Sequence, residues 1–337
     1  MIARPTAAPR ARRAIPGLLA FAALVGALLA PAAAGAQAEW PTRPVRVVVP
    51  LAAGGVLDTI TRLLGAEIGR RLGQPVVVEN RPGAAGAVGA AAVAKGAPDG
   101  YLLCSCANAS FTLLPHTQPA LGYDPARELL PVAALYAVDV FLAVRADDPS
   151  ATLADLVAAA RARPGRVAYG SNGPGSGAHL VGATLEDAAR VQLLHVPYKG
   201  EQQALAGLLG GEVDVAIVSA ATAATQLKAG RVRLLATASA ARSAVLPEVP
   251  TAAEAGVPGL RSEIWAALLA PAGTPPAVVE RLRSATAATL QDPAIAERLV
   301  ALGASPARTP PAALEQAVRA ESERMAALAK RLGLGSN

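Results

Sequence analysis

Two glycine-rich segments are the places where residue type and spacing could support chemistry. One is Pro50 to Asp58, which contains Gly54-Gly55, and the other is Gly170 to Ala178, which contains Gly173-Pro174-Gly175-Ser176-Gly177. Each follows an apolar run typical of a strand and precedes a pattern typical of a helix. A glycine loop at a helix N-terminus presents free N–H groups and the positive end of the helix dipole. Both segments therefore predict anion binding.

The second segment also fits the dinucleotide-binding pattern G-x-G-x-x-A from Gly173 to Ala178. That pattern needs an acidic residue at the end of the next strand, where it binds the ribose. Here that strand ends His195-Val196-Pro197-Tyr198-Lys199 without an acid, so general anion binding is favoured over nucleotide binding. A tight turn without a ligand explains the first segment alone equally well, but two matching segments favour a shared carboxylate clamp. Asp58, in the first helical turn, is interpreted as a cap rather than an acid catalyst.

The sequence contains no recognisable catalytic constellation. Ser171 fails the nucleophile pattern G-x-S-x-G because Tyr169 stands at the first glycine position. The three histidines are expected to be far apart and lack metal-ligand spacing: His116, His179 and His195. His179, near a helix start, is interpreted as a packing or loop-bracing residue. We therefore predict neither catalysis nor a metal or other cofactor.

Cys104 and Cys106 are the only cysteines. They would lie on one face of a strand, where a bridge between positions i and i+2 would be badly strained. We expect two small buried residues without a disulfide.

The elements that must position the glycine segments form two similar units. In the first, strands are expected at Val45–Val49, Pro75–Glu79 and Tyr101–Ser105, with helices between them. In the second, a leading helix at Leu153–Ala162 is followed by strands at Arg166–Tyr169, Val191–Val196 and Val213–Val218, separated by helices at Ala178–Ala189 and Gln202–Leu209. This β-α-β-α-β order predicts an α/β protein with parallel sheets and ligands at the carboxyl ends of the strands.

The length predicts two lobes, because about 300 residues exceed a usual single core. We expect lobe 1 over residues 39–140 and 238–337, and lobe 2 over residues 141–237. The chain is expected to cross at Val138–Val144 and return at Arg233–Thr237, and then to form helices at Pro276–Leu290 and Pro310–Leu332.

Residues 1–38 have the pattern of a secretory signal peptide. Four arginines precede an apolar run from Gly17 to Ala30, and small residues with two possible A-x-A cleavage sites follow. The run is about 14 residues long, whereas a membrane span needs about 20, so cleavage is favoured over anchoring. Arg12-Arg13 leaves twin-arginine export open, although the general route fits better. The mature chain is predicted to be periplasmic.

Removing the leader leaves 27 Lys and Arg against 25 Asp and Glu, a net charge of +2. No basic stripe with interleaved aromatic residues remains, which excludes a nucleic-acid-binding footprint. We expect a soluble monomer.

Several short sequence motifs, in the order in which they occur, resemble those of the periplasmic receptors of tripartite tricarboxylate transporters, which are called the Bug receptors. The similarity covers essentially the whole mature chain. It is carried by Trp40-Pro41-Thr42-Arg43-Pro44, Gly54-Gly55 with Asp58, Val78-Glu79-Asn80-Arg81-Pro82-Gly83, Ala97-Pro98-Asp99-Gly100-Tyr101, His179-Leu180, His195-Val196-Pro197-Tyr198-Lys199-Gly200, Gly211-Glu212-Val213-Asp214, Pro250-Thr251 with Glu254 and Gly256, and Ala270-Pro271-Ala272-Gly273-Thr274-Pro275.

The resemblance implies a type II periplasmic binding-protein fold, with two Rossmann-like lobes that close on a small carboxylate. It also implies membrane subunits of a tripartite transporter as partners. Carried onto this chain, the ligand-binding residues are Ala53, Gly54 and Gly55 in one lobe and Ser171, Ser176, Gly177, Ala178 and Ser219 in the other. A ligand-sensing receptor for a signalling partner, or an exported hydrolase, are the alternative functions.

Four residues depart from the family pattern. Val56, Leu57 and Ala178 stand where relatives often have hydroxyl residues, and Ser219 stands near a frequent Asp. These departures favour a monocarboxylate with an aliphatic or aromatic body over citrate, tartrate or an amino acid. The alternative, that the side chains point away from the cleft, stays open.

Overall fold

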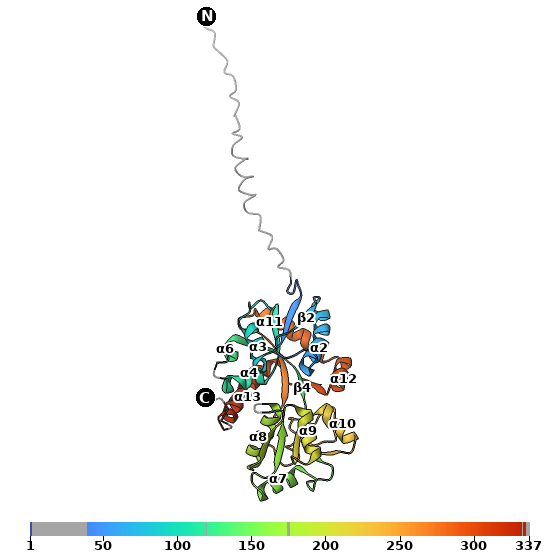
Figure 1. Ribbon diagram of the computed structural model, residues 1–337. Helices are drawn as coiled ribbons and strands as arrows, with labels where there is room; N and C mark the ends of the chain where they lie inside the picture. Colours follow the sequence, from blue (N-terminus) through green and yellow to red (C-terminus); the bar gives the residue numbers. More distant parts are fainter. Residues whose placement is uncertain (2–38, 119, 174–175, 332, 335–337) are drawn as a thin grey trace. The chain divides into compact units, whose positions relative to one another are not determined.

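The computed structural model describes residue 1 and residues 39–337, apart from 119, 174–175, 332 and 335–337 (Figure 1). The predicted signal peptide therefore lies almost entirely outside the described residues. The described chain forms two β-sheets, each packed against helices, which confirms the α/β class. Among the described helices, none is long and apolar enough to cross a membrane.

The first sheet has six strands in the order β11-β4-β10-β3-β1-β2. Their bounds are β1 (Val45–Val49), β2 (Val76–Asn80), β3 (Leu102–Ala107), β4 (Leu129–Val138), β10 (Ile264–Pro271) and β11 (Ala304–Pro306). The helical segments that accompany this sheet are α2 (Val56–Leu72), η1 (Ala84–Gly86), α3 (Ala87–Ala94), α4 (Ala109–Thr112), α5 (Leu114–Thr117), α6 (Pro125–Glu128), α11 (Pro276–Leu290), α12 (Pro293–Ala301) and α13 (Pro311–Arg331).

Helix α2 shows how the sequence specifies an element beside the first glycine segment. Ile60, Leu64 and Ile68 recur at helical spacing and are buried. The helix ends at Gly73, whose left-handed φ of 76° allows its N–H to bond to the carbonyl of Gly69.

The second sheet has five strands in the order β7-β6-β8-β5-β9. Their bounds are β5 (Val140–Arg145), β6 (Ala168–Ser171), β7 (Leu194–Pro197), β8 (Val215–Ser219) and β9 (Val232–Thr237). Four helices surround this sheet in Figure 1: α7 (Leu153–Ala162), α8 (Gly177–Ala189), α9 (Glu201–Gly210) and α10 (Ala220–Lys228). Helix α7 begins at a capping box, in which Thr152 and Asp155 each bond to the other's backbone N–H.

Both sheets are mixed, which corrects the prediction of parallel sheets. The predicted parallel pairs are present, since β1 pairs with β2 and β3, and β6 pairs with β7 and β8. However, β10 lies antiparallel between β3 and β4, and β5 lies antiparallel between β8 and β9. The sequence did not predict β4, β10, β11 or α12. Pro131 interrupts the apolar run of β4, and β10 is a continuous apolar run whose burial on both faces leaves no alternation.

The outward crossing between the sheets is a single residue, Asp139, between β4 and β5. Most of the predicted crossing at Val138–Val144 therefore belongs to β5, and the predicted return at Arg233–Thr237 belongs to β9. The buried Asp139 carboxylate accepts hydrogen bonds from the hydroxyls of Ser239, Ser243 and Ser305, at 2.7, 2.6 and 3.3 Å. These bonds tie the outward crossing to the return segment and to β11. The exact lobe boundaries stay a prediction.

Cys104 and Cys106 are joined by a disulfide, so the expectation of two separate residues was wrong. Both are fully buried on β3, as expected. Their Cα atoms lie 5.5 Å apart, within the range that disulfides span. The placement on one strand face that was expected to prevent a bridge brings the two sulfurs together.

Candidate functional site

The first glycine segment connects β1 to α2 at the carboxyl end of β1. Ala53, Gly54 and Gly55 are exposed, and Gly54 has a φ of 81°, in the left-handed region that favours glycine. The first hydrogen bond of α2 runs from Thr59 N to Gly55 O, at 2.9 Å. The N–H groups of the four residues Gly55 to Asp58 precede that bond and have no acceptor among the described residues. They can therefore donate to an anion.

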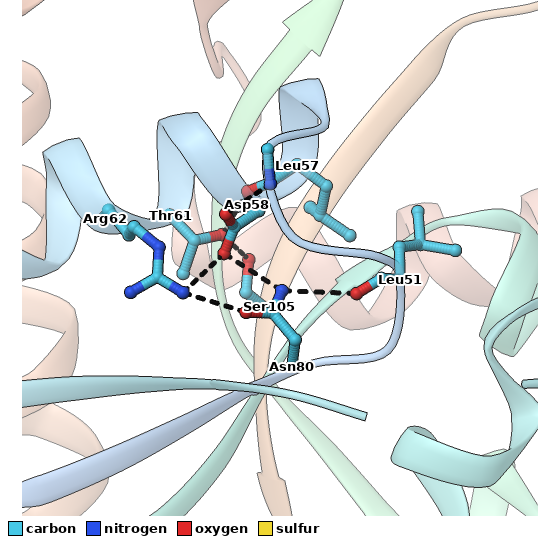
Figure 2. Close-up of polar contacts among 8 residues, drawn as sticks. Leu51, Leu57, Asp58, Thr61, Arg62, Asn80 and Ser105 are labelled. Atoms are coloured by element: carbon cyan, nitrogen blue, oxygen red, sulfur yellow. Dashed lines mark hydrogen bonds and ion pairs between the residues drawn. The ribbon is translucent and has the colours of Figure 1, made fainter. Parts of the chain in front are cut away.

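A charged network holds this segment in place, as Figure 2 shows. Asp58 Oδ2 accepts the N–H of Gly54 at 2.8 Å, and its Oδ1 accepts bonds from Asn80 Nδ2 at 3.0 Å and Arg62 Nη2 at 2.9 Å. Asn80 Nδ2 also donates to Leu51 O at 3.2 Å. The bond from Arg62, supported by those from Gly54 and Asn80, outweighs burial and lowers the pKa of Asp58 to about 2.

Asp58 is therefore an ionised brace for the segment. It bonds one residue before the N-cap Gly55, rather than capping α2 itself as the sequence suggested. Its bond also occupies the N–H of Gly54, which leaves that group unavailable to a ligand while the network is intact.

The side chains expected to give the site an apolar lining separate into two kinds. Leu57 and Ala178 are each only 5% exposed and contribute to the hydrophobic cores. Val56 is 52% exposed. Of these three side chains, only Val56 therefore presents an apolar surface beside a glycine segment, which weakens the prediction of an apolar-bodied ligand.

The second glycine segment leaves β6 at Ser171 and enters α8 at Gly177; residues 174–175 lie outside the described residues. Ser176 is the N-cap of α8, and its hydroxyl accepts the N–H of His179 at 3.2 Å. The first backbone bond of α8 runs from Leu180 N to Ser176 O, at 3.0 Å. The N–H groups of Gly177 and Ala178 precede it and have no described acceptor. They correspond in position to those of Val56 and Leu57, the first two residues of α2.

Ser171 is fully buried and holds the start of this segment. Its Oγ accepts the N–H of Gly173 at 3.0 Å and lies 2.6 Å from His195 Nε2. Ser171 and Ser176 were both predicted as ligand-binding residues, and their hydroxyls bond to the backbone of the segment.

The second segment lies against the carboxyl edge of the first sheet. A Cβ placed on Gly177 would be 2.7 Å from Cδ1 of Ile264, the first residue of β10. Because β10 is antiparallel to β3, and β3 is parallel to β1, Ile264 lies at the edge where β1 delivers the first glycine segment. Both glycine segments therefore lie at the carboxyl edge of the first sheet.

His179 and His195 are stacked, which corrects the expectation that the histidines are far apart. Their ring centroids are 4.1 Å apart with an interplanar angle of 16°. Burial, with a contribution from the neighbouring His195, lowers the pKa of His179 to about 4, and burial also lowers the pKa of His195. No carboxylate among the described residues bonds to His195, so the Ser171–His195 pair lacks the acid that orients a catalytic base.

Ser219 ends β8 and is the N-cap of α10. Its N–H and its hydroxyl both donate to Glu201 Oε1, at 3.2 and 2.9 Å. The structure thus places a carboxylate beside Ser219, at the position where the sequence indicated that an acid is missing.

Four residues of the site were not predicted from the sequence: Arg62, Asn80, His195 and Glu201. Two of these residues could have been predicted from their positions in the sequence. Arg62 follows Asp58 at the i,i+4 spacing of helical ion pairs, and Asn80 ends the strand beside β1. The other two depend on which strands are neighbours, which the sequence does not state.

A family model described as the tripartite tricarboxylate transporter family receptor matches residues 60–334. The chain belongs to this family. A curated relative from Agrobacterium vitis, encoded in the ttuE–ttuC′ intergenic region, is 39% identical over 318 residues, which cover 93% of this chain and 91% of the relative.

Solved structures agree with this assignment. The periplasmic binding protein BugD is 34% identical, with a TM-score of 0.68 over 88% of this chain and 99% of its own. A structure of R. palustris Rpa4515 with adipate is 35% identical, with a TM-score of 0.72 over the same shares. MatC from Rhodopseudomonas palustris with bound malate is 34% identical, with a TM-score of 0.67 over 86% of this chain and 99% of its own. This receptor thus has the two-lobed fold of periplasmic solute-binding proteins, which are not enzymes.

Proposed function

We propose that this receptor captures a small organic carboxylate between its two glycine segments and delivers it to the membrane subunits of a tripartite transporter. The observation that carries the proposal is the presence of N–H groups without an acceptor at each of two helix starts. They belong to Gly55, the N-cap of α2, with the first three residues of α2, and to Gly177 and Ala178, the first two residues of α8. Such groups favour an anion through hydrogen bonds and through the helix dipole. Adipate and malate in the two related structures are anions of this class.

The predicted ligand-binding residues take two roles in this proposal. Gly55, Gly177 and Ala178 donate to the carboxylate through the backbone. The others shape or brace the segments: Ala53, Gly54, Ser171, Ser176 and Ser219. Lobe 1 (residues 39–140 and 238–337) closes on lobe 2 (residues 141–237) around the ligand. The leader, residues 1–38, directs export and is removed.

Calorimetry on receptor purified from the periplasm tests the capture step. Adipate and malate are titrated together with their uncharged diamides. We expect binding of at least one acid and none of its diamide, because the N–H donors need an anionic acceptor. Equal affinity for acid and diamide would contradict the clamp.

Uptake by cells that express the membrane subunits, with and without the receptor, tests delivery. Accumulation of the labelled acid should require both components. Uptake that does not depend on the receptor would contradict the transport role.

A further inference from the structure

We propose that Glu201 is a specificity-determining residue, and that it selects carboxylates bearing a second group that donates a hydrogen bond, an ammonium or a hydroxyl. This inference rests on the proposed function above and deepens it. The sequence alone favoured the opposite ligand, an acid with an apolar body.

The Glu201 carboxylate is fixed at one oxygen and open at the other. Oε1 accepts the N–H and the hydroxyl of Ser219, at 3.2 and 2.9 Å. Oε2 has no hydrogen-bond partner among the described residues, and Glu201 forms no ion pair there. The side chain is half-buried. A carboxylate oriented in this way can accept a hydrogen bond from a bound molecule.

The strand order places this carboxylate beside the second glycine segment. Strands β7 and β8 flank β6 on either side. Glu201 follows β7, so its side chain must pass over the carboxyl end of β6 to reach Ser219 at the end of β8. Ser171 and the glycine segment begin at that end of β6.

Backbone contacts support the same placement. Tyr198, three residues before Glu201, donates its N–H to Ser171 O at 2.9 Å. A Cβ placed on Gly173 would lie 3.6 Å from Tyr198 O. The segment that leads into α9 therefore lies directly against the second glycine segment.

Charge defines the ligand class. The N–H groups at the helix starts attract an anion. Glu201 repels an anion unless the ligand also carries a hydrogen-bond donor that faces the Glu201 carboxylate. The Asp139 carboxylate, at the crossing between the two sheets, already accepts hydrogen bonds from three serine hydroxyls. A ligand that carries a carboxylate at one end and a donor group nearby satisfies both Glu201 and the N–H groups.

Two matched sets of acids test the assignment by calorimetry. One set is succinate, malate and aspartate, and the other is glutarate, 2-hydroxyglutarate and glutamate. Within each set the acids differ in one group: hydrogen, hydroxyl or ammonium. We expect one donor-bearing acid to bind at least tenfold more tightly than its parent, about 1.4 kcal/mol. The donor that gives the larger gain distinguishes a hydroxy acid from an amino acid.

Glu201→Gln should abolish most of that preference while leaving the affinity for the parent acid unchanged or higher. Its amide oxygen can still accept the bonds from Ser219, so the fold should be retained. Ser219→Ala, which frees the carboxylate from its support, should reduce the preference less. Glu248→Gln is the matched control, because Glu248 is exposed and makes no hydrogen bond or ion pair in the described part of the chain.

Three results would overturn the assignment. Equal affinity for parent and donor-bearing acids in the wild type is one, and an unchanged preference in Glu201→Gln is another. The third is an equal loss of affinity for every acid in Glu201→Gln, which would indicate a structural role. Binding of none of the six acids would overturn the assignment; binding of adipate by the same protein would still support the proposed function, and its failure to bind would contradict that function too.

Discussion

The two glycine segments occupy matching positions in their lobes but are braced by different chemistry. The first depends on an ionised carboxylate, Asp58, which is held by Arg62 and Asn80. The second depends on neutral groups, namely the Ser171 hydroxyl, the Ser176 cap and the stacked His179 and His195 rings. Each brace leaves backbone N–H groups at a helix start without an acceptor among the described residues. An anion site built from the backbone can therefore be supported by quite different side chains.

The two braces should differ most in how their contributions to the free energy of unfolding change at acidic pH. An unfolded histidine binds a proton near pH 6.5, whereas folded His179 does so only near pH 4. The unfolded state binds more protons in that window, so the free energy of unfolding should fall by on the order of 2–3 kcal/mol as the pH drops through it. The loss of stability caused by protonation of Asp58 should follow at lower pH. Its stabilisation is present above its unfolded pKa of about 4 and is lost as the pH falls towards 2.

Denaturant unfolding measured at a series of pH values checks this order. His179→Gln should lose most of the slope between pH 6.5 and pH 4 and keep the slope at lower pH. A wild-type stability that stays constant from pH 6.5 to pH 4 would contradict the buried neutral pair.

Removing the charged brace should have the next largest effect. Asp58→Ala leaves the Gly54 N–H without its acceptor and leaves the Arg62 guanidinium bonded to Asn80 Oδ1 alone, so we expect a loss of about 2 kcal/mol in stability and more than tenfold in ligand affinity. Glu67→Ala is the control on the same helix, because Glu67 pairs with Arg70 and Arg71 and braces no loop. Equal effects of the two variants on affinity, measured by calorimetry, would show that the brace does not shape the site.

The backbone of the first segment can be tested at Gly54. Gly54→Val should weaken binding tenfold or more, about 1.4 kcal/mol, in a protein that remains folded. A Cβ at this position meets nothing within 4 Å, so the cost arises from the left-handed φ of 81° rather than from crowding. Gly54→Asn should therefore be milder, since Asn tolerates this region better than a β-branched residue. If both variants lose the same affinity, the side chain obstructs the ligand directly.

The smallest effect is expected at the cap of the second segment. Ser176→Ala removes the bond to His179 N and should cost about 1 kcal/mol of stability, whereas Ser176→Gly should cost only a few tenths. Denaturant titration of the two variants measures this difference in the free energy of unfolding. A larger loss in Ser176→Gly than in Ser176→Ala would argue against a capping role.

The sequence by itself determined the elements whose signal is local. The bounds of β1, α7 and α11 agree with the prediction, because hydrophobic spacing, caps and flanking prolines are properties of neighbouring residues. The parallel pairs of each β-α-β unit and the exposed glycine segments followed from the same patterns. The backbone part of the candidate site was accordingly predictable.

The tertiary structure decided the features that depend on which strands are neighbours. His195 contacts Ser171 because β7 lies beside β6, and Glu201 reaches Ser219 because β8 lies on the other side of β6. Continuous apolar strands such as β10 also carry no periodicity that distinguishes them from other buried segments. The pairing of side chains distant in sequence is set by the packing of the whole lobe. For that reason, the sequence located the free N–H groups, and only the fold located the carboxylate beside them.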